Sequence, residues 1–172
     1  MVSVAVLLLS GCEQNDLPNA SIQTAIAEMN ARPNAFPDYP QPNRTYLSFS
    51  LAHGFQVNFF AGNGRAYLWY PGNRNVVAEA YKLDVVAGQQ ALCWRHPENS
   101  FNPVTRTTGG QFRCESLAMA QRTMAAVVAG DPYRLSEGNI PYVLDKCVAP
   151  EEFVFDRNRF SCSMDINAVV GG

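Results

Sequence analysis

The chain has little charge and no basic excess. Of its 172 residues, 16% are charged and thirteen are Lys or Arg, and the net charge is −2. A nucleic-acid-binding protein needs clustered basic side chains to neutralise phosphates, whereas the basic residues here are scattered. Hydrophobic residues make up 47% of the chain, which argues against overall disorder. The composition therefore predicts one globular domain and no nucleic-acid partner.

Motifs for catalysis and cofactor binding are also missing. The sequence has no Gly-x-Ser-x-Gly or Ser-x-x-Lys motif, no glycine-rich phosphate loop and no Cys-x-x-Cys pair. Its two histidines, His53 and His96, lie beside predicted turns or loops, where solvated side chains are the usual case. We therefore expect a non-enzymatic protein with no cofactor and no metal.

Three acidic residues keep one enzymatic alternative open. Asp145, Glu151 and Glu152 lie close together in the sequence, and a pair of carboxylates across a cleft hydrolyses glycosidic bonds. This alternative is an enzyme that acts on glycans of the cell envelope.

The N-terminal segment carries a targeting signal. Residues 2–9 are mainly apolar, but a bilayer span needs about 20 residues, and the length suits a signal peptide. Leu9, Ser10, Gly11 and Cys12 follow in the order of a lipobox, so this segment resembles the signal peptide of bacterial lipoproteins. The resemblance implies diacylglycerol on Cys12, cleavage after Gly11 and a lipid-anchored protein, since two or three acyl chains anchor stably.

The other cysteines are even in number, as expected for disulfides in an exported protein. Four cysteines allow three connectivities. Sequential pairing between neighbouring predicted strands favours Cys93–Cys114 and Cys147–Cys162. Each bridge closes a loop of about 15–22 residues, for which chain entropy predicts about 3 kcal/mol.

Composition along the chain predicts four segments. They are a signal peptide (1–11), a lipid-anchored tether with a short helix and a proline-rich lead-in (12–44), a single β-rich domain (45–166) and a tail (167–172). The helix is expected at 21–31, where apolar residues recur at helical spacing. We expect the lead-in to lie against the domain through Phe36 and Tyr39.

Within the domain, short apolar runs alternate with turn signals. Residues 55–59 alternate apolar and polar side chains, and Asn63-Gly64 predicts a hairpin. Further strands are expected at 76–86 and 91–94, a helix at 116–129 and a last hairpin between 153 and 162. The predicted fold class is α+β, mainly β, with a meandering antiparallel sheet of six to eight strands, one or two covering helices and two disulfides.

A second resemblance spans about residues 55–114 and is carried by residues 63–72, 92–95 and 109–114. These stretches resemble small uncharacterised bacterial envelope domains, in which an Asp/Asn-Gly hairpin precedes a strand ending in Leu-Cys. The resemblance implies a β-rich fold and a disulfide, and it implies no activity.

Two features suggest a binding surface. If Tyr67 and Trp69 face the core, Leu68 and Tyr70 face outward, unless the helix at 116–129 covers them. The polar loop at 97–110 exceeds the usual connection length of about 4–6 residues. The candidate binding residues are Leu68, Tyr70, Arg95, Asn99, Asn102 and Arg106.

The predicted function is a membrane-anchored lipoprotein of the bacterial envelope whose domain lies in the periplasm. It would serve as a binding module or accessory subunit, with a protein partner in the envelope. A further alternative is a periplasmic inhibitor of a muralytic, lysozyme-type enzyme.

Overall fold

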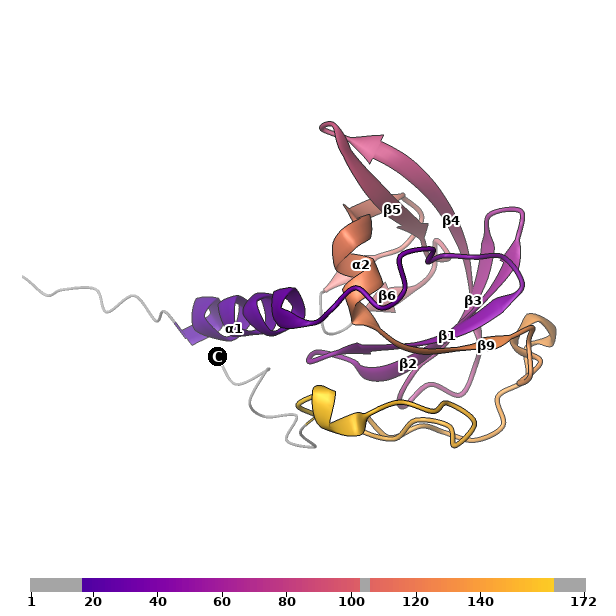
Figure 1. The fold of residues 1–172 in the computed structure, drawn as a ribbon. Coiled ribbons are helices and arrows are strands. Elements are labelled where there is room, and N and C mark those ends of the chain that lie inside the picture. Colours follow the sequence, from indigo (N-terminus) through magenta and orange to yellow (C-terminus); the bar gives the residue numbers. More distant parts are fainter. Residues whose placement is uncertain (1–16, 103–105, 163–172) are drawn as a thin grey trace, which may run out of the picture.

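An antiparallel sheet forms the centre of the computed structural model, which describes residues 17–102 and 106–162 (Figure 1). The predicted signal peptide, Cys12 and the tail lie outside the described residues. The seven strands have the order β8-β5-β4-β3-β2-β1-β9. Their bounds are β1 Arg44–Ser50, β2 Gly54–Gly62, β3 Arg65–Trp69, β4 Val77–Val86, β5 Gln89–Arg95, β8 Arg113–Ser116 and β9 Met124–Ala129.

The remaining elements are short, apart from one helix. A two-stranded ladder lies within the 97–110 loop, and the two helices lie before and after most of the sheet strands. Their bounds are α1 Leu17–Ala31, α2 Leu117–Thr123, β6 Phe101–Asn102, β7 Thr107–Thr108, and the 3-10 turns η1 Leu135–Glu137 and η2 Arg157–Arg159. None of the helices in the described ranges is long and apolar enough to cross a membrane. The predicted fold class is confirmed.

The hairpin of β2 and β3 forms where the sequence predicts it. Asn63 and Gly64 both have positive φ, at 46° and 75°, as a tight hairpin turn requires. In β2, Phe55 and Val57 are buried while Gln56 and Asn58 are only partly buried. The alternating pattern therefore identified the strand and its core face.

Both faces of the central strands are covered, so neighbouring residues of one strand enter different cores. Tyr46 belongs to one buried cluster and Leu47 to the other. The proline-rich lead-in (residues 32–43) and α2 cover the first face. There the centre of the Tyr39 ring lies 4.8 Å from that of Tyr46 and 5.4 Å from that of Phe60. Residues 130–162, here called the C-terminal cover, pack on the other face. Figure 1 shows the lead-in above the sheet and the C-terminal cover beneath it.

The C-terminal cover docks at the turn between β1 and β2. The Phe55 amide donates a hydrogen bond to the Lys146 carbonyl at 3.0 Å. A Cβ atom at Gly54 would lie 1.9 Å from that carbonyl oxygen, so only glycine permits this approach. The cover is closed by the predicted Cys147–Cys162 disulfide.

The predicted last hairpin between 153 and 162 is wrong. The cover contains the 3-10 turns η1 and η2 and no strand in its described part. Its backbone makes local turns, such as the bond from the Phe160 amide to the Arg157 carbonyl at 3.1 Å. Phe153 and Phe160 are buried in the core, so their apolar character reflects packing and not strand pairing.

The predicted helix at 116–129 is half right. Helix α2 ends at Thr123, and β9 pairs with β1 through residues such as Val127 and Val128, which lie opposite Tyr46 and Thr45. Short apolar runs suit either a helix or a buried strand. Here the free edge of β1 and the β-branched valines favour the strand.

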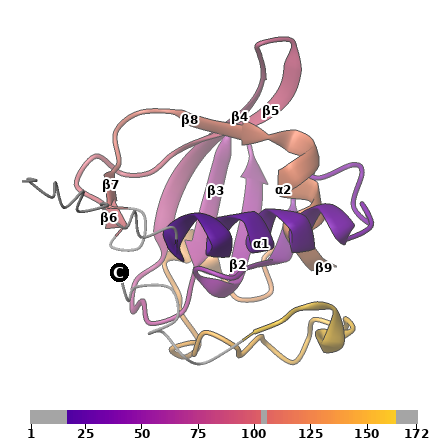
Figure 2. The same cartoon turned by 90° about the vertical axis from the view of Figure 1, so that its left-hand side faces the viewer.

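Strands β4 and β5 form a hairpin that projects from the body of the domain (Figures 1 and 2). Near its tip, Leu83, Val85 and Val86 are 52%, 58% and 48% exposed. The predicted disulfide between Cys93 and Cys114 joins directly opposite positions of β5 and β8.

Candidate functional site

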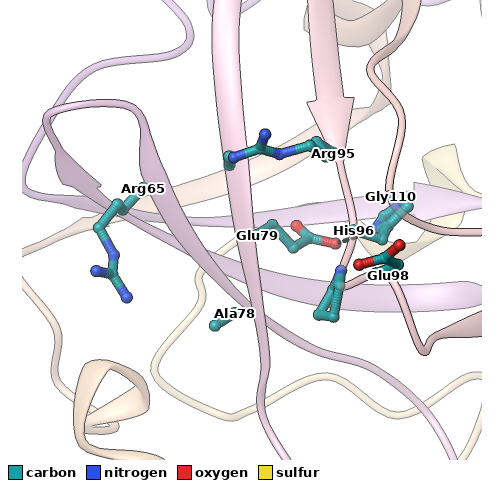
Figure 3. Close-up of a pocket in the computed structure, with 9 residues that line it drawn as sticks. Arg65, Ala78, Glu79, Arg95, His96, Glu98 and Gly110 are labelled. Atoms are coloured by element: carbon teal, nitrogen blue, oxygen red, sulfur yellow. Dashed lines mark ion pairs between the residues drawn. The ribbon is translucent and has the colours of Figure 1, made fainter.

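A cavity of about 480 Å³ lies where β3, β4, β5 and the 97–110 loop meet (Figure 3). It combines charged side chains with small residues and is open to solvent. The lining residues are Arg65, Ala78, Glu79, Ala80, Arg95, His96, Pro97, Glu98 and Gly110.

The strand register places two arginines on one face of the sheet. Arg65 and Arg95 are both paired with Ala80, from the two strands that flank β4. Side chains directly opposite on neighbouring strands point to the same face. Ala78, two residues before Ala80, shares this face. The small alanines therefore form a floor between two long cationic side chains, and Figure 3 shows Arg95 extending across β4.

Aromatic rings contact both guanidinium groups. The Cζ atom of Arg95 lies 5.0 Å from the centre of the Phe112 ring, and that of Arg65 lies 5.8 Å from the centre of the Tyr67 ring. Such cation–π contacts orient a guanidinium without neutralising it. Within residues 17–102 and 106–162, neither Arg65 nor Arg95 has an acidic partner.

An ion pair with a buried carboxylate lies at the same end of the strands. Glu79 and His96 each lie one residue beyond the Ala80–Arg95 pair, which is the last pair of the β4–β5 ladder at this end. The Glu79 side chain is only 2% exposed, and its Oε1 lies 2.6 Å from Nδ1 of His96 (Figure 3). By alternation along β4, Glu79 projects from the face opposite to Ala78 and Ala80.

The two members of the pair affect each other's proton affinity. Burial raises the pKa of Glu79, and the hydrogen bond with His96 opposes this shift. The hydrogen bond with Glu79 raises the pKa of His96. One proton held between carboxylate and imidazole leaves the pair neutral overall, which is how a buried carboxylate is tolerated. Nδ1 is engaged, so Nε2 is the nitrogen left for other contacts.

The 97–110 loop closes back on itself to form a wall of the cavity. The Gly110 amide donates to the His96 carbonyl at 3.0 Å, and the Gly109 amide donates to the Ser100 carbonyl at 3.1 Å. A Cβ atom at Gly109 would lie 1.9 Å from the Pro97 carbonyl oxygen. The glycine pair thus lets the two ends of the loop approach closely enough to hold His96 and Pro97 in place.

The second histidine has a structural setting. His53 Nδ1 lies 3.3 Å from Ser50 Oγ, and Asn102 Nδ2 lies 3.3 Å from His53 Nε2. Because the amide nitrogen donates to Nε2, the ring proton is on Nδ1 and points at Ser50. Ser50 Oγ also accepts from the His53 backbone amide at 3.1 Å. The serine has no base to take its proton, so this cluster is not a nucleophilic triad.

The expectation of an exposed His53 is therefore wrong, whereas the His96 side chain is 41% exposed and has in addition an ionic partner that was not expected. His53 is partly buried, and burial lowers its pKa. His96 is partly buried and paired with Glu79. Neither partnership is visible from neighbours in the sequence.

The structure brings one of the six candidate binding residues to the cavity, namely Arg95. Asn99 and Arg106 are exposed elsewhere on the loop, and Leu68 and Tyr70 are partly buried. Asn102 contacts His53. The predicted outward face of β3 is thus not an open aromatic surface.

The three predicted carboxylates lie in the C-terminal cover, away from the residues that line the cavity. Asp145 and Glu151 are exposed, and Glu152 accepts a hydrogen bond from the Tyr133 hydroxyl at 3.0 Å. Among the described residues the buried carboxylate is Glu79, which was not among the predicted site residues. One sequence signal pointed to its burial. Glu79 lies on the same face of β4 as Tyr81, Leu83 and Val85, which are aromatic or apolar.

Comparison of the chain with protein-family models, curated proteins and solved structures found no match. In the part of the chain that the structure describes, no three His, Cys, Asp or Glu side chains are grouped to hold a metal ion. Any functional assignment therefore depends on the chemistry of the cavity and on the predicted lipobox.

Proposed function

We propose that this chain is an exported, membrane-anchored binding module of the bacterial cell envelope, and that its binding site is the cavity at the ends of β3, β4 and β5. The observation that carries the proposal is the pair of arginines, Arg65 and Arg95, that flank an alanine floor with no acidic partner of their own. Both guanidinium groups are exposed and have no ionic partner within the described residues, so an anionic ligand that enters the cavity can form charge-assisted hydrogen bonds with them.

Two further observations support the envelope location. Both disulfides link cysteines of the folded domain, and such bonds persist in oxidising compartments. The lipobox-like residues before Cys12 supply the proposed anchor. Helix α1, which precedes the lead-in, would then lie between the anchored terminus and the folded domain.

The anchor is tested by intact-mass measurement of protein purified from bacterial membranes. A diacylated or triacylated chain that starts at Cys12 is the expected species. The Cys12→Ser variant should lose the lipid mass and leave the membrane fraction. An unmodified N-terminus on the wild-type protein in membranes would refute the anchor.

The binding role is tested by a photo-crosslinking amino acid at position 78, an exposed residue on the cavity floor. Val154 is 92% exposed and outside the cavity lining, so the same amino acid at position 154 is the matched control. In native membranes, a discrete adduct from position 78 alone is expected. Equal adducts at both positions, or none at position 78, would refute a binding site here.

One observation favours a second candidate, an enzyme that acts on envelope glycans. Glu98 and Glu79 are both among the residues at the cavity, and burial raises the pKa of Glu79, as in a general acid, although its side chain projects from the other face of β4. Release of soluble fragments from purified cell walls, abolished by Glu79→Gln, would support the enzyme. Intact cell walls after incubation with the wild-type protein would remove it.

A further inference from the structure

We infer that the cavity binds a singly charged oxyanion, a carboxylate or a phosphodiester group, held between Arg65 and Arg95 above the floor formed by Ala78 and Ala80. This inference rests on the proposed function, because it names the ligand chemistry of the same site. In this inference the ligand's negative charge is recognised by two arginines on the strands that flank β4. Within the described residues neither arginine forms an ion pair.

The geometry suits an anion of small size. Arg65 and Arg95 are separated by one strand, so their backbones stand about 10 Å apart. Ala80 between them has a side chain of one carbon, which leaves the space above it open. Both arginines line the cavity, and each guanidinium group supplies paired N–H donors that match the oxygens of a carboxylate or phosphate.

The charges favour a single negative charge on the ligand. Arg65 and Arg95 contribute two positive charges, and Glu98 contributes one negative charge at the same cavity. The Glu79–His96 pair is neutral overall. The lining thus carries one net positive charge, which a monoanion neutralises and a dianion overcompensates.

The floor and the aromatic contacts favour a ligand that also has an apolar part. Ala78 and Ala80 expose methyl groups to the cavity, and Phe112 and Tyr67 back the two guanidinium groups. An alkyl chain or glycerol unit attached to the oxyanion would pack on these methyl groups. Small organic monoanions are therefore expected to bind more tightly than inorganic ones.

The test is calorimetric titration of the full lipoprotein in neutral detergent with dimethyl phosphate and with acetate. Saturable binding with one site is expected for at least one of them, and weaker binding for sulfate. Arg65→Gln and Arg95→Gln should each raise the Kd about tenfold, because each removes charge-assisted hydrogen bonds. Arg95→Lys keeps the positive charge but lacks the planar guanidinium with its paired N–H donors. It should therefore retain only part of the affinity.

Arg74→Gln is the matched control, because Arg74 is an exposed arginine outside the cavity lining. It should leave the Kd unchanged, and circular dichroism should show that every variant is folded. Equal losses for Arg74→Gln and Arg95→Gln would overturn the inference, since they would indicate general surface charge. Absence of saturable binding to either probe, or tighter binding of sulfate, would also overturn it.

The source of the oxyanion is resolved by mass spectrometry of lipids that copurify with the protein. More anionic phospholipid on the wild type than on Arg95→Gln assigns the site to a lipid headgroup, and equal amounts assign it to a free small molecule. A position-78 adduct in membranes without any monoanion binding would overturn the oxyanion and leave the proposed binding module standing.

Discussion

The strands β9, β1 and β2 and the hairpin of β4 and β5 belong to one sheet, but they are built differently. The first group is covered on both faces, so Leu47 and Tyr46 are buried in two separate cores. The hairpin exposes Leu83 and Val85 near its tip and bears the cavity at its base. Unpaired charged side chains are therefore possible only on strand segments that are not covered on both faces.

This difference explains why the cavity is where it is. A charged side chain under a cover must be paired or neutralised, and Glu79 meets that condition through His96. Arg65 and Arg95 lie beyond the cover, where solvent stabilises an unpaired guanidinium. The covered strands form the two buried cores, and the uncovered strand ends carry the arginines of the cavity.

The largest effect is expected from breaking the cover. Leu144→Ala removes a side chain that is 1% exposed and packed in the core beneath the sheet. The free energy of unfolding, measured by urea denaturation, should fall by about 2–5 kcal/mol, the usual cost of such a cavity.

Its neighbour provides the control. Val143 is 48% exposed, and Val143→Ala should change the free energy of unfolding by no more than about 0.5 kcal/mol. Equal effects at the two positions would mean that the C-terminal cover is not part of the folded core.

Removal of each disulfide should have a somewhat smaller effect. Cys147–Cys162 and Cys93–Cys114 close segments with sequence separations of 15 and 21. The double Cys→Ser variant of either pair should be less stable by about 3 kcal/mol on chain entropy.

Limited proteolysis distinguishes the two disulfides. The cover has no strand pairing to hold it in the described residues, so the variant without Cys147–Cys162 should be cut within residues 130–162. The variant without Cys93–Cys114 keeps the β5–β8 ladder and should not be cut there. Cutting of the cover in both variants would contradict its dependence on its own disulfide.

The sequence predicted the fold where the signal was local. The Asn63–Gly64 turn and the alternation in β2 depend on neighbouring residues. Sequential pairing of the cysteines gave both correct disulfides, although Cys147 and Cys162 do not lie on the strands that were predicted for them. Residues 124–129 were assigned to the wrong element because their strand exists only beside β1. A local sequence pattern does not reveal which edge of a sheet is free to pair with a further strand.

The cavity depends even more on distant pairing. Arg95 was a candidate from its place beside the loop, but Arg65 joins it only through the shared partner Ala80. Glu79 and His96 are brought together by the β4–β5 register. A one-residue change of register would move Glu79 to the other face, so the site follows from the fold and not from a motif.

The smallest expected effect is a pH dependence that separates the two histidines. The hydrogen bond with Glu79 raises the pKa of His96 above its ordinary 6.5. The stabilisation from His96 is thus fully present below pH 6.5 and is lost as the pH rises through the folded pKa. Burial raises the pKa of Glu79 above 4.5, so its contribution also falls as the pH rises above 4.5.

His53 should behave in the opposite way, because burial lowers its pKa below 6.5. The folded state then binds fewer protons than the unfolded state, and stability rises with pH up to about 6.5. Urea midpoints of His96→Gln and His53→Gln, compared with the wild type from about pH 5 to 9, measure both slopes. The His96 difference should shrink above pH 6.5, and the His53 difference should change below it. Slopes of the same sign would contradict the pairing of His96 with a buried carboxylate, because only that partner reverses the effect of burial on an imidazole.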